Sequence, residues 1–205
     1  FQQLFKALEL MKFEHGGKCF HVSYGHVKRP EGKMSSRLGN TFTFSQLMNI
    51  ILEEIEKHLD KYRGSWDEKE LQETAQKLAV GAVKYGMLSV DAPKDIIFDP
   101  QQWTSFEGNS GPYLMYSYTR SASILNKYHQ NFPQPELTSL ESFSDPSEFQ
   151  LLRFLYDFNE VAYQAATQYR PSLAANHLYN MCKSFNRFYA HVSVLGAKEE
   201  KERSA

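Results

Sequence analysis

The sequence predicts a mainly α-helical protein that begins with a short α/β segment. From residue 43 onward, apolar side chains recur every three or four positions, which is the period of amphipathic helices. Before residue 43, a helical pattern is followed by a short apolar run and then by a loop rich in glycine, serine and cations. This order fits the end of a doubly wound α/β domain, in which ligands sit beyond the carboxyl ends of the strands.

The composition is that of an ordinary globular chain. Of 205 residues, 41% are hydrophobic and 23% are charged, so one or two domains with a sizeable core are expected. No apolar run approaches the roughly 18 residues of a membrane span, and no secretory signal opens the sequence. We therefore expect a cytoplasmic protein without a membrane partner. Its cysteines, Cys19 and Cys182, are expected to be reduced and buried.

The charge balance bears on possible nucleic-acid partners. The formal net charge is −1, which gives no overall attraction for RNA or DNA. Any contact with nucleic acid must therefore come from local patches.

Both ends of the sequence lie within helical or charged patterns that carry no start or stop signal, and we interpret the chain as an internal fragment.

The first segment predicts a helix and then a strand. Residues 1–13 alternate charged side chains with apolar ones at Leu4, Phe5, Leu8 and Met11. Two glycines at 16 and 17 end this helix, and residues 19–22 are predicted to form a strand that ends at Tyr24 and Gly25. No metal site is expected at His15, Cys19 and His21, because nothing supplies a fourth ligand.

Residues 31–40, Glu-Gly-Lys-Met-Ser-Ser-Arg-Leu-Gly-Asn, have the chemistry of a phosphate-binding loop. Glycine lets the backbone approach a ligand closely, and consecutive N–H groups in such a turn can surround an anion. Lys33 supplies a mobile charge, and Arg37 supplies a planar fork that suits phosphate oxygens. The chemical interpretation is a polyphosphate clamp, and the alternative is a polar surface loop.

Two helices follow this loop. Thr43 and Gln46 form a capping-box signature, and the helix that they start has an apolar stripe of Met48, Ile51, Leu52, Ile55 and Leu59. Residues 62–64 end it. Ser65 and Glu68 are predicted to start the next helix, whose stripe is Leu71, Ala75, Leu78, Ala82 and Tyr85. Gly81 and Gly86 inside that helix predict close packing against a neighbour.

The middle of the chain combines turns with two further helices. Residues 91–94 predict a turn and residues 96–98 an extended segment. Pro112 suits the first turn of a helix that runs to about Tyr128, and residues 131–146 predict a surface loop. Asp145 and Glu148 predict an N-terminal cap for a helix whose apolar stripe is Leu151, Leu155, Phe158, Ala162 and Ala165.

The last helix has the most regular pattern. Its seam, predicted to be buried, consists of Ala174, Leu178, Met181, Phe185, Phe188, Val192 and Leu195. At the helical period, the opposite face carries Tyr179, Lys183, Asn186 and Arg187. Tyr189 lies at the border, about 60° from the centre of the seam.

Three motifs resemble those of one protein family. Residues 33–37 resemble the Lys-Met-Ser-Lys-Ser loop of class I aminoacyl-tRNA synthetases, with Ser36 and Arg37 in place of the final Lys-Ser. Residues 105–114, Ser-Phe-Glu-Gly-Asn-Ser-Gly-Pro-Tyr-Leu, continue through Tyr116, Tyr118 and Arg120 and resemble the start of the anticodon-binding domain of arginyl-tRNA synthetases. Residues 184–189, followed by Val-Leu at 194–195, resemble a later helix of the same domain.

The resemblance implies an organisation for the whole chain. Residues 1–42 correspond to the C-terminal tail of a Rossmann-type class I catalytic domain, and residues 43–104 to a helical region that contacts the tRNA stem. Residues 105–205 correspond to the anticodon-binding helical bundle, truncated at its C-terminus. The family's His-Ile-Gly-His motif and most of its arginine pocket would lie upstream of residue 1, so the fragment alone is expected to be inactive.

The resemblance also implies an activity, which is the ATP-dependent attachment of arginine to its tRNA. The expected partners are ATP, tRNA and, in the full-length enzyme, arginine. ATP is a substrate that brings its own Mg²⁺, and no protein-bound metal is expected. Lys33 and Arg37 would be the catalytic cations, and the residues expected to bind ATP are His21, Val22, Tyr24, Gly25, Gly32, Met34, Ser35 and Ser36.

A second set of residues is expected to bind tRNA. Aromatic side chains near a surface stack on unpaired bases, and neighbouring cations hold phosphates. The candidates are Arg120, Tyr179, Lys183, Asn186, Arg187 and Tyr189. For Lys183 the alternative is a solvated helix face, and Tyr113, Tyr116 and Tyr118 are expected in the core or at a domain interface.

Two alternative functions remain open at this point. One is another class I synthetase, such as the cysteinyl or methionyl enzyme, which shares this helical anticodon-binding domain. The other is a non-catalytic paralogue that binds RNA or a protein partner.

Overall fold

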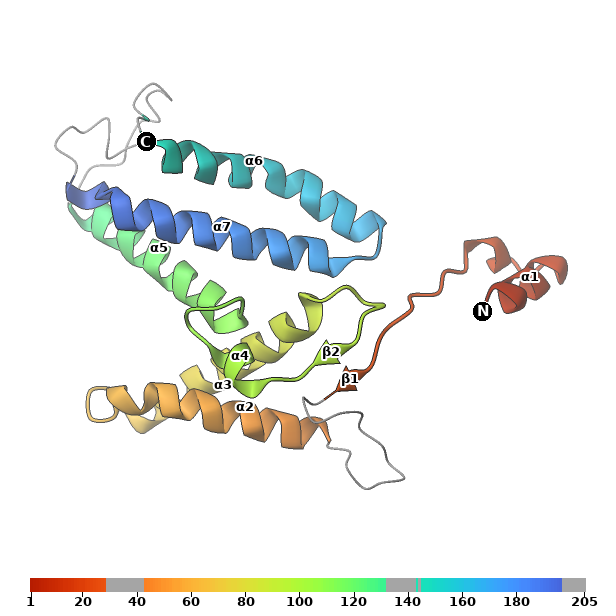
Figure 1. Cartoon of the computed structure of the whole chain (residues 1–205), viewed down its shortest axis with the longest axis horizontal. Coiled ribbons are helices and arrows are strands. Elements are labelled where there is room, and N and C mark those ends of the chain that lie inside the picture. Colours follow the sequence, from red (N-terminus) through yellow and green to blue (C-terminus); the bar gives the residue numbers. More distant parts are fainter. Residues whose placement is uncertain (29–42, 132–142, 144, 197–205) are drawn as a thin grey trace.

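The structure, a computed structural model, describes residues 1–28, 43–131, 143 and 145–196 (Figure 1). Its helices are α1 (Gln2–Leu10), α2 (Phe44–Leu59), α3 (Glu68–Leu88), α4 (Pro100–Thr104), α5 (Gly111–Asn131), α6 (Pro146–Thr167) and α7 (Pro171–His191). Short 3₁₀ turns occupy Gly16–Lys18, Asp60–Tyr62 and Val194–Gly196, and two short strands are β1 (Val27–Lys28) and β2 (Ile96–Ile97). The prediction of a mainly helical protein is confirmed.

The long helices form two groups in space. Figure 1 shows α6, α7 and α5 stacked above α3 and α2, while α1 projects away from the rest. In the part of the chain that the structure describes, no helix combines the length and the apolar character that a membrane crossing requires. The predicted loops at residues 31–40 and 131–146 lie wholly or mostly outside the described residues.

Helices α2, α3 and α4 enclose the apolar core. Their caps follow local rules: Thr43 and Gln46 form the predicted capping box of α2, and Asp67 accepts the Glu70 N–H at the start of α3. The predicted cap at Ser65 is therefore wrong. The buried cluster consists of Leu47, Ile51, Ile55, Leu59, Leu71, Ala75, Leu78, Ala79, Ala82, Val83, Phe98 and Trp103.

The glycines of α3 mark two close approaches. A Cβ atom on Gly86 would lie 2.5 Å from the ring of Trp103 in α4, and one on Gly81 would lie 2.6 Å from the Met115 sulfur in α5. At the same crossing, a Cβ on Gly111 would lie 2.3 Å from the Gly81 carbonyl oxygen. The close packing predicted from these glycines is confirmed.

The N-terminal segment differs from its prediction. Residues 19–22 form no strand. Instead, β1 pairs in parallel with β2, which follows α3 in the chain. The Ile96 N–H donates to the His26 carbonyl (2.9 Å), and the Phe98 N–H donates to the Lys28 carbonyl (2.7 Å). The strand β1 therefore begins at Val27, where the backbone lies beside β2.

Helix α7 also differs from the one-sided pattern that its sequence suggests. It packs against both α5 and α6, so its seam is half-buried, and its most buried residues are Ser172, Ala175 and Ser184. It ends at His191, and Val192 is extended, so Leu195 is not part of the helix.

On α6, Leu155 belongs to the predicted apolar stripe but is 53% exposed. Cys19 and Cys182 are free thiols, half-buried rather than buried.

Candidate nucleic-acid interface

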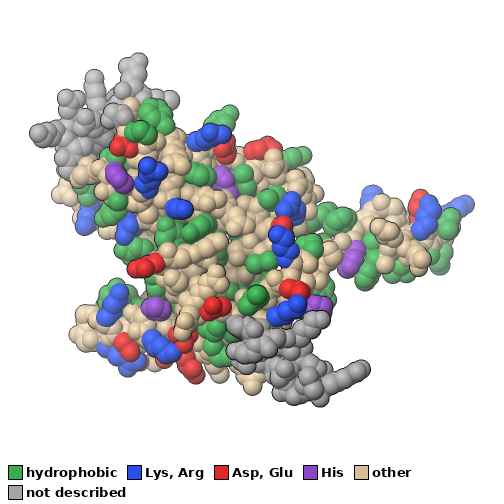
Figure 2. Space-filling view, viewed as in Figure 1, with side chains coloured by type: hydrophobic (Ala, Val, Ile, Leu, Met, Phe, Trp, Pro, Cys, Tyr) green, Lys and Arg blue, Asp and Glu red, His purple; other side chains and the backbone are tan. Residues whose placement is uncertain are grey.

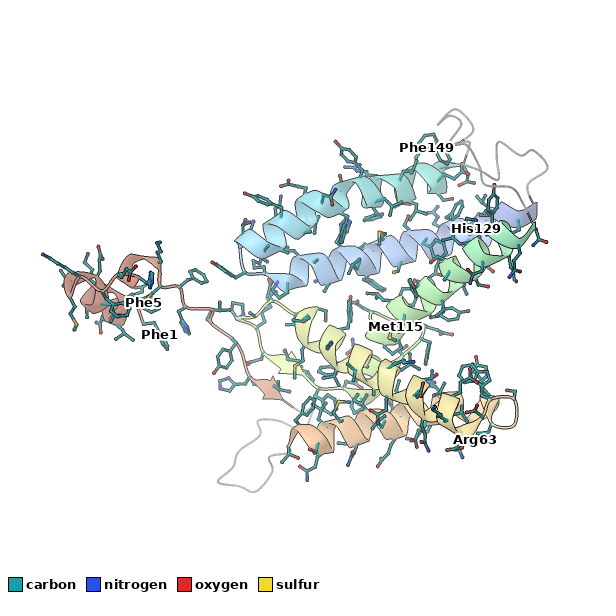
Figure 3. The ribbon with its side chains drawn as sticks, turned by 180° about the vertical axis from the view of Figure 1, so that it is seen from behind. Phe1, Phe5, Arg63, Met115, His129 and Phe149 are labelled. Atoms are coloured by element: carbon teal, nitrogen blue, oxygen red, sulfur yellow. The ribbon has the colours of Figure 1, made fainter. Side chains whose placement is uncertain are left out.

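A groove of about 590 Å³ lies where the C-terminal half of α5 meets the end of α7 and the residues that follow it. Figure 3 labels His129, near the end of α5, close to the end of α7. The groove is lined by Tyr116, Thr119, Arg120, Ser123, Ile124, Lys127, Tyr189, Ala190, His191, Val192, Ser193, Val194 and Leu195. Its walls therefore combine aromatic, aliphatic and cationic side chains.

Arg120 links the two helices across this groove. Its guanidinium carbon lies 4.6 Å from the ring centre of Tyr116 and 4.5 Å from that of Tyr189, both within the range of cation–π contacts. One terminal nitrogen donates to the Asn186 side-chain oxygen (2.7 Å), and the other donates to the Tyr116 hydroxyl (2.7 Å). Tyr189 remains 44% exposed, so part of its ring is open to a ligand.

Asn186 is held by three partners on α5. Besides accepting from Arg120, its amide nitrogen donates to the Tyr113 hydroxyl (2.9 Å) and to the Ser117 hydroxyl (2.8 Å). Both amide N–H bonds are therefore used inside the protein. The sequence pattern placed Asn186 on a face away from the packed seam, and that orientation is wrong because the face packs against α5.

The other candidates for RNA binding separate into inner and outer residues. Tyr179 is half-buried with its ring 5.6 Å from that of Tyr113, so it also faces α5 instead of solvent. Lys183 and Arg187 are exposed on α7. The structure thus brings Arg120, Asn186 and Tyr189 together and leaves the two remaining cations on the outer surface of the helix.

Tyr116 is a groove residue that the sequence reasoning missed. It was predicted to be in the core or at a domain interface, but it is 45% exposed and lines the groove. The spacing of Tyr116 from Arg120 could have indicated this position, because residues four apart lie on the same face of a helix. Tyr118 is 73% exposed and is not among the lining residues, while Tyr113 is half-buried.

Polar groups that do not line the groove also lie where α3 meets α7. The Tyr85 hydroxyl lies 2.5 Å from the Asn109 side-chain oxygen and 3.3 Å from the Ala175 carbonyl, joining α3 to α7. Burial raises the pKa of Tyr85 above its ordinary value, and burial also raises the pKa of the Cys182 thiol. Both groups are therefore neutral near pH 7.

The face of the molecule seen in Figure 2 shows no single basic patch among the described residues. Figure 2 shows Lys and Arg side chains scattered among acidic and apolar ones over the visible face. Within residues 1–28, 43–131 and 145–196, no group of three or more His, Cys, Asp or Glu side chains is arranged to hold a metal ion.

The residues expected to bind ATP are only partly described. Lys33, Arg37, Gly32, Met34, Ser35 and Ser36 lie outside the described residues. His21, Val22 and Tyr24 are exposed, and the His21 ring stacks on Phe1 with 3.8 Å between ring centres. The Gly25 N–H donates to the Ala92 carbonyl (2.7 Å), and a Cβ at Gly25 would lie 2.1 Å from the Lys94 carbonyl oxygen. Glycine is therefore required for this contact.

The segment that leads to residues 29–42 is anchored by Asp95. Its carboxylate forms an ion pair with Lys28 and accepts the His26 backbone N–H (2.8 Å). The hydrogen bond from Lys28 and then that from His26 lower the pKa of Asp95 to about 2. Asp95 is therefore ionised at neutral pH and keeps β1 beside β2.

Asp91 makes a second link, to the start of α7. Arg170 donates to its carboxylate (2.8 Å), as does the Ser172 hydroxyl, and the hydrogen bond from Arg170 is the main reason that the pKa of Asp91 is lowered. The ring of Phe20 also stacks on Tyr169, with 4.7 Å between ring centres. The Asp91 contacts join the start of α7 to the residues after α3, and the Phe20 contact joins the turn between α6 and α7 to the N-terminal segment.

Comparison with known proteins identifies the relatives of this chain. Residues 114–205 match the family described as the DALR anticodon binding domain. The chain is 36% identical over 203 residues to the arginine–tRNA ligase of Bdellovibrio bacteriovorus, and the match covers 98% of this chain and 34% of that protein. It is 37% identical over 206 residues to the arginine–tRNA ligase of Phocaeicola vulgatus, with the same coverage.

Solved structures give the same relationship. The arginyl-tRNA synthetase of Thermus thermophilus superposes with a TM-score of 0.81 at 26% identity, covering 98% of this chain and 33% of that one. The enzyme of Plasmodium falciparum superposes with a TM-score of 0.67 at 21% identity, covering 90% of this chain and 30% of that one, which shows a common fold. The resemblance read from the three motifs is confirmed. The chain spans about a third of the length of the curated relatives that it matches.

Proposed function

We propose that this chain, which is related over 98% of its length to arginine–tRNA ligases, is the tRNA-binding part of such an enzyme and also carries its ATP-clamping loop. The observation that carries the proposal is the cluster of Tyr116, Arg120 and Tyr189 in an open groove within the region that matches the anticodon-binding domain. The reaction is the ATP-dependent attachment of arginine to its tRNA.

The chemistry of the groove suits an unpaired base. A ring that is partly exposed, such as that of Tyr189, can stack on a base that is not paired in a helix. A volume of about 590 Å³ lies within the range of small-ligand pockets. Lys127 in the groove and Arg187 on the outer face of α7 would hold phosphates on either side of that base. With a net charge of −1, binding would depend on these local contacts.

The remainder of the chain is assigned by the same proposal. Residues 1–42 would belong to the catalytic domain, residues 43–104 would contact the tRNA stem, and residues 105–205 would bind the anticodon. Lys33 and Arg37 would stabilise the charge that develops on the triphosphate, which is the usual contribution of positioned cations to phosphoryl chemistry. His21, Val22, Tyr24 and Gly25 would border the nucleotide, which arrives with its own Mg²⁺. Arginine would bind to parts of the enzyme outside this chain, and the enzyme would act in the cytoplasm.

The experiment is a tRNA affinity measurement on the chain itself. We expect Tyr189→Ala to weaken the affinity for an arginine tRNA about 5- to 150-fold at fixed salt, since stacking one base contributes roughly 1–3 kcal/mol. Tyr189→Phe keeps the ring and is expected to bind almost as tightly as the unchanged chain. Fixed salt is essential because phosphate contacts make the affinity depend on ionic strength.

Tyr118→Ala is the matched control. Tyr118 is an exposed tyrosine of α5 that does not line the groove, so its removal is expected to leave the affinity unchanged. Equal affinity of the unchanged chain and of a folded Tyr189→Ala variant would contradict the proposed site. Failure of the unchanged chain to bind arginine tRNA would contradict the proposed function as a whole.

A further inference from the structure

We infer that Arg120 supports RNA binding as a positioning residue, by fixing the rings of Tyr116 and Tyr189, and does not itself bind a phosphate. The inference rests on the proposed function and concerns the same groove. A cation in an RNA site would ordinarily be assigned to a phosphate. The contacts of Arg120 point to a different role.

The first observation is the position of the guanidinium between side chains of two helices. Its carbon lies within 4.6 Å of the ring centre of Tyr116 on α5 and within 4.5 Å of that of Tyr189 on α7. Phe185 is a further aromatic neighbour of Tyr189, with 6.3 Å between the two ring centres. Arg120 therefore contacts the Tyr189 ring from the neighbouring helix, whereas Phe185 lies on the same helix as Tyr189.

The second observation is that both terminal nitrogens of Arg120 already have protein partners. One donates to Asn186 and the other to the Tyr116 hydroxyl, each at 2.7 Å. Arginine binds phosphate best through two parallel N–H bonds, which form a planar fork. Of the five N–H donors of Arg120, two are thus engaged, and a phosphate that used these two would have to displace Asn186 and the Tyr116 hydroxyl.

The third observation is that the partner of Arg120 is itself fixed. Asn186 is half-buried and donates to Tyr113 and Ser117, so its oxygen cannot turn to follow a moving guanidinium. Ser117, 3% exposed, donates in turn to the Tyr113 carbonyl (3.0 Å). Contacts therefore connect Tyr113 and Ser117 of α5 to Asn186, and Asn186 to Arg120. Arg120 in turn contacts the rings of Tyr116 and Tyr189. Its effect is to hold the rings in place before RNA arrives, which lowers the cost of ordering them on binding.

The experiment is the salt dependence of tRNA affinity for the chain and for Arg120→Gln. A residue that binds one phosphate contributes about 0.7–0.9 to the slope of log K against log salt concentration. We expect Arg120→Gln to weaken the affinity about fivefold or more, through the loss of ordered stacking, at every salt concentration with the slope unchanged. A slope reduced by about 0.7–0.9 would overturn the inference, and so would an unchanged affinity.

The variants Arg120→Lys and Tyr116→Phe distinguish the effect of the Arg120 charge on affinity from the effect of its position. Arg120→Lys keeps the charge but loses the planar fork, so we expect it not to restore the affinity; full restoration would overturn the inference. Tyr116→Phe removes only the hydroxyl that accepts from Arg120 and is expected to fold even if Arg120→Gln does not. It is expected to weaken the affinity without changing the slope, and unchanged affinity would count against the inference.

Arg187→Gln provides the comparison for the slope measurement. Arg187 is an exposed arginine of α7 that does not line the groove, and as a phosphate contact its removal is expected to reduce the slope by about 0.7–0.9. Binding of tRNA by the unchanged chain is measured first. Its absence would refute the proposed function, which is a different result from a changed slope in Arg120→Gln.

Discussion

The helices α2–α4 and the helices α5–α7 are held together by different forces. In the first group, Ile51, Ile55 and Ala79 are fully buried in a continuous apolar cluster. In the second, the contacts between α5 and α7 include the polar side chains of Ser117, Asn186 and Arg120. Burial of apolar area stabilises a fold in proportion to the area, whereas a hydrogen bond contributes little net free energy but fixes geometry. The apolar cluster of the first group therefore contributes mainly to stability, and the polar contacts between α5 and α7 mainly fix the geometry of the groove.

The largest expected effect is on the apolar side of this comparison. We expect Ile51→Ala to lower the free energy of unfolding by about 2–5 kcal/mol, because it leaves a cavity in a closely packed core. The measurement is denaturant unfolding followed by circular dichroism. Leu155→Ala on α6 is the matched control, since Leu155 is 53% exposed and its loss is expected to cost less than about 0.5 kcal/mol. Similar losses for both variants would remove the distinction between the two groups.

A smaller effect on stability is expected on the polar side. Asn186→Ala leaves the hydroxyls of Tyr113 and Ser117 and one nitrogen of Arg120 without their present partner. We expect a loss of about 1–3 kcal/mol in the free energy of unfolding, together with weaker tRNA binding, because Arg120 is no longer held.

Asn180→Ala is the matched control for that prediction. Asn180 is an exposed asparagine of the same helix, and its removal is expected to change neither stability nor affinity. If Asn186→Ala lowered stability but left tRNA affinity unchanged, the polar contacts would serve the fold alone.

Features that depend on nearby residues are predicted better from the sequence than features that depend on distant residues. The capping boxes at Thr43 and Asp145 and the buried stripe of α3 are confirmed, because these features depend on residues a few positions apart. The position of β1 could not be predicted, because its partner is Ile96, which lies far along the chain. The face of α7 that carries Asn186 was assigned wrongly because a helical pattern assumes one packed side, and α7 has neighbours on two.

The same reasoning applies to the candidate site. Arg120, Asn186 and Tyr189 were selected from the helical pattern and the family resemblance, and the structure brings them together. The sequence could not show that Asn186 is turned inward or that Tyr116 completes the groove, because both depend on how α5 packs against α7. The catalytic roles of Lys33 and Arg37 remain predictions, since these residues lie outside the described part of the chain.

The most direct test of the central claim uses a small RNA. The chain is mixed at fixed salt with the anticodon stem-loop of an arginine tRNA, and with versions in which single loop bases have been removed while the backbone is kept. If the groove between α5 and α7 binds an unstacked base, the stem-loop binds, and loss of one particular base weakens the affinity about 5- to 150-fold, as expected for roughly 1–3 kcal/mol of stacking. Equal affinity for the intact stem-loop and for every version with a missing base would contradict the claim.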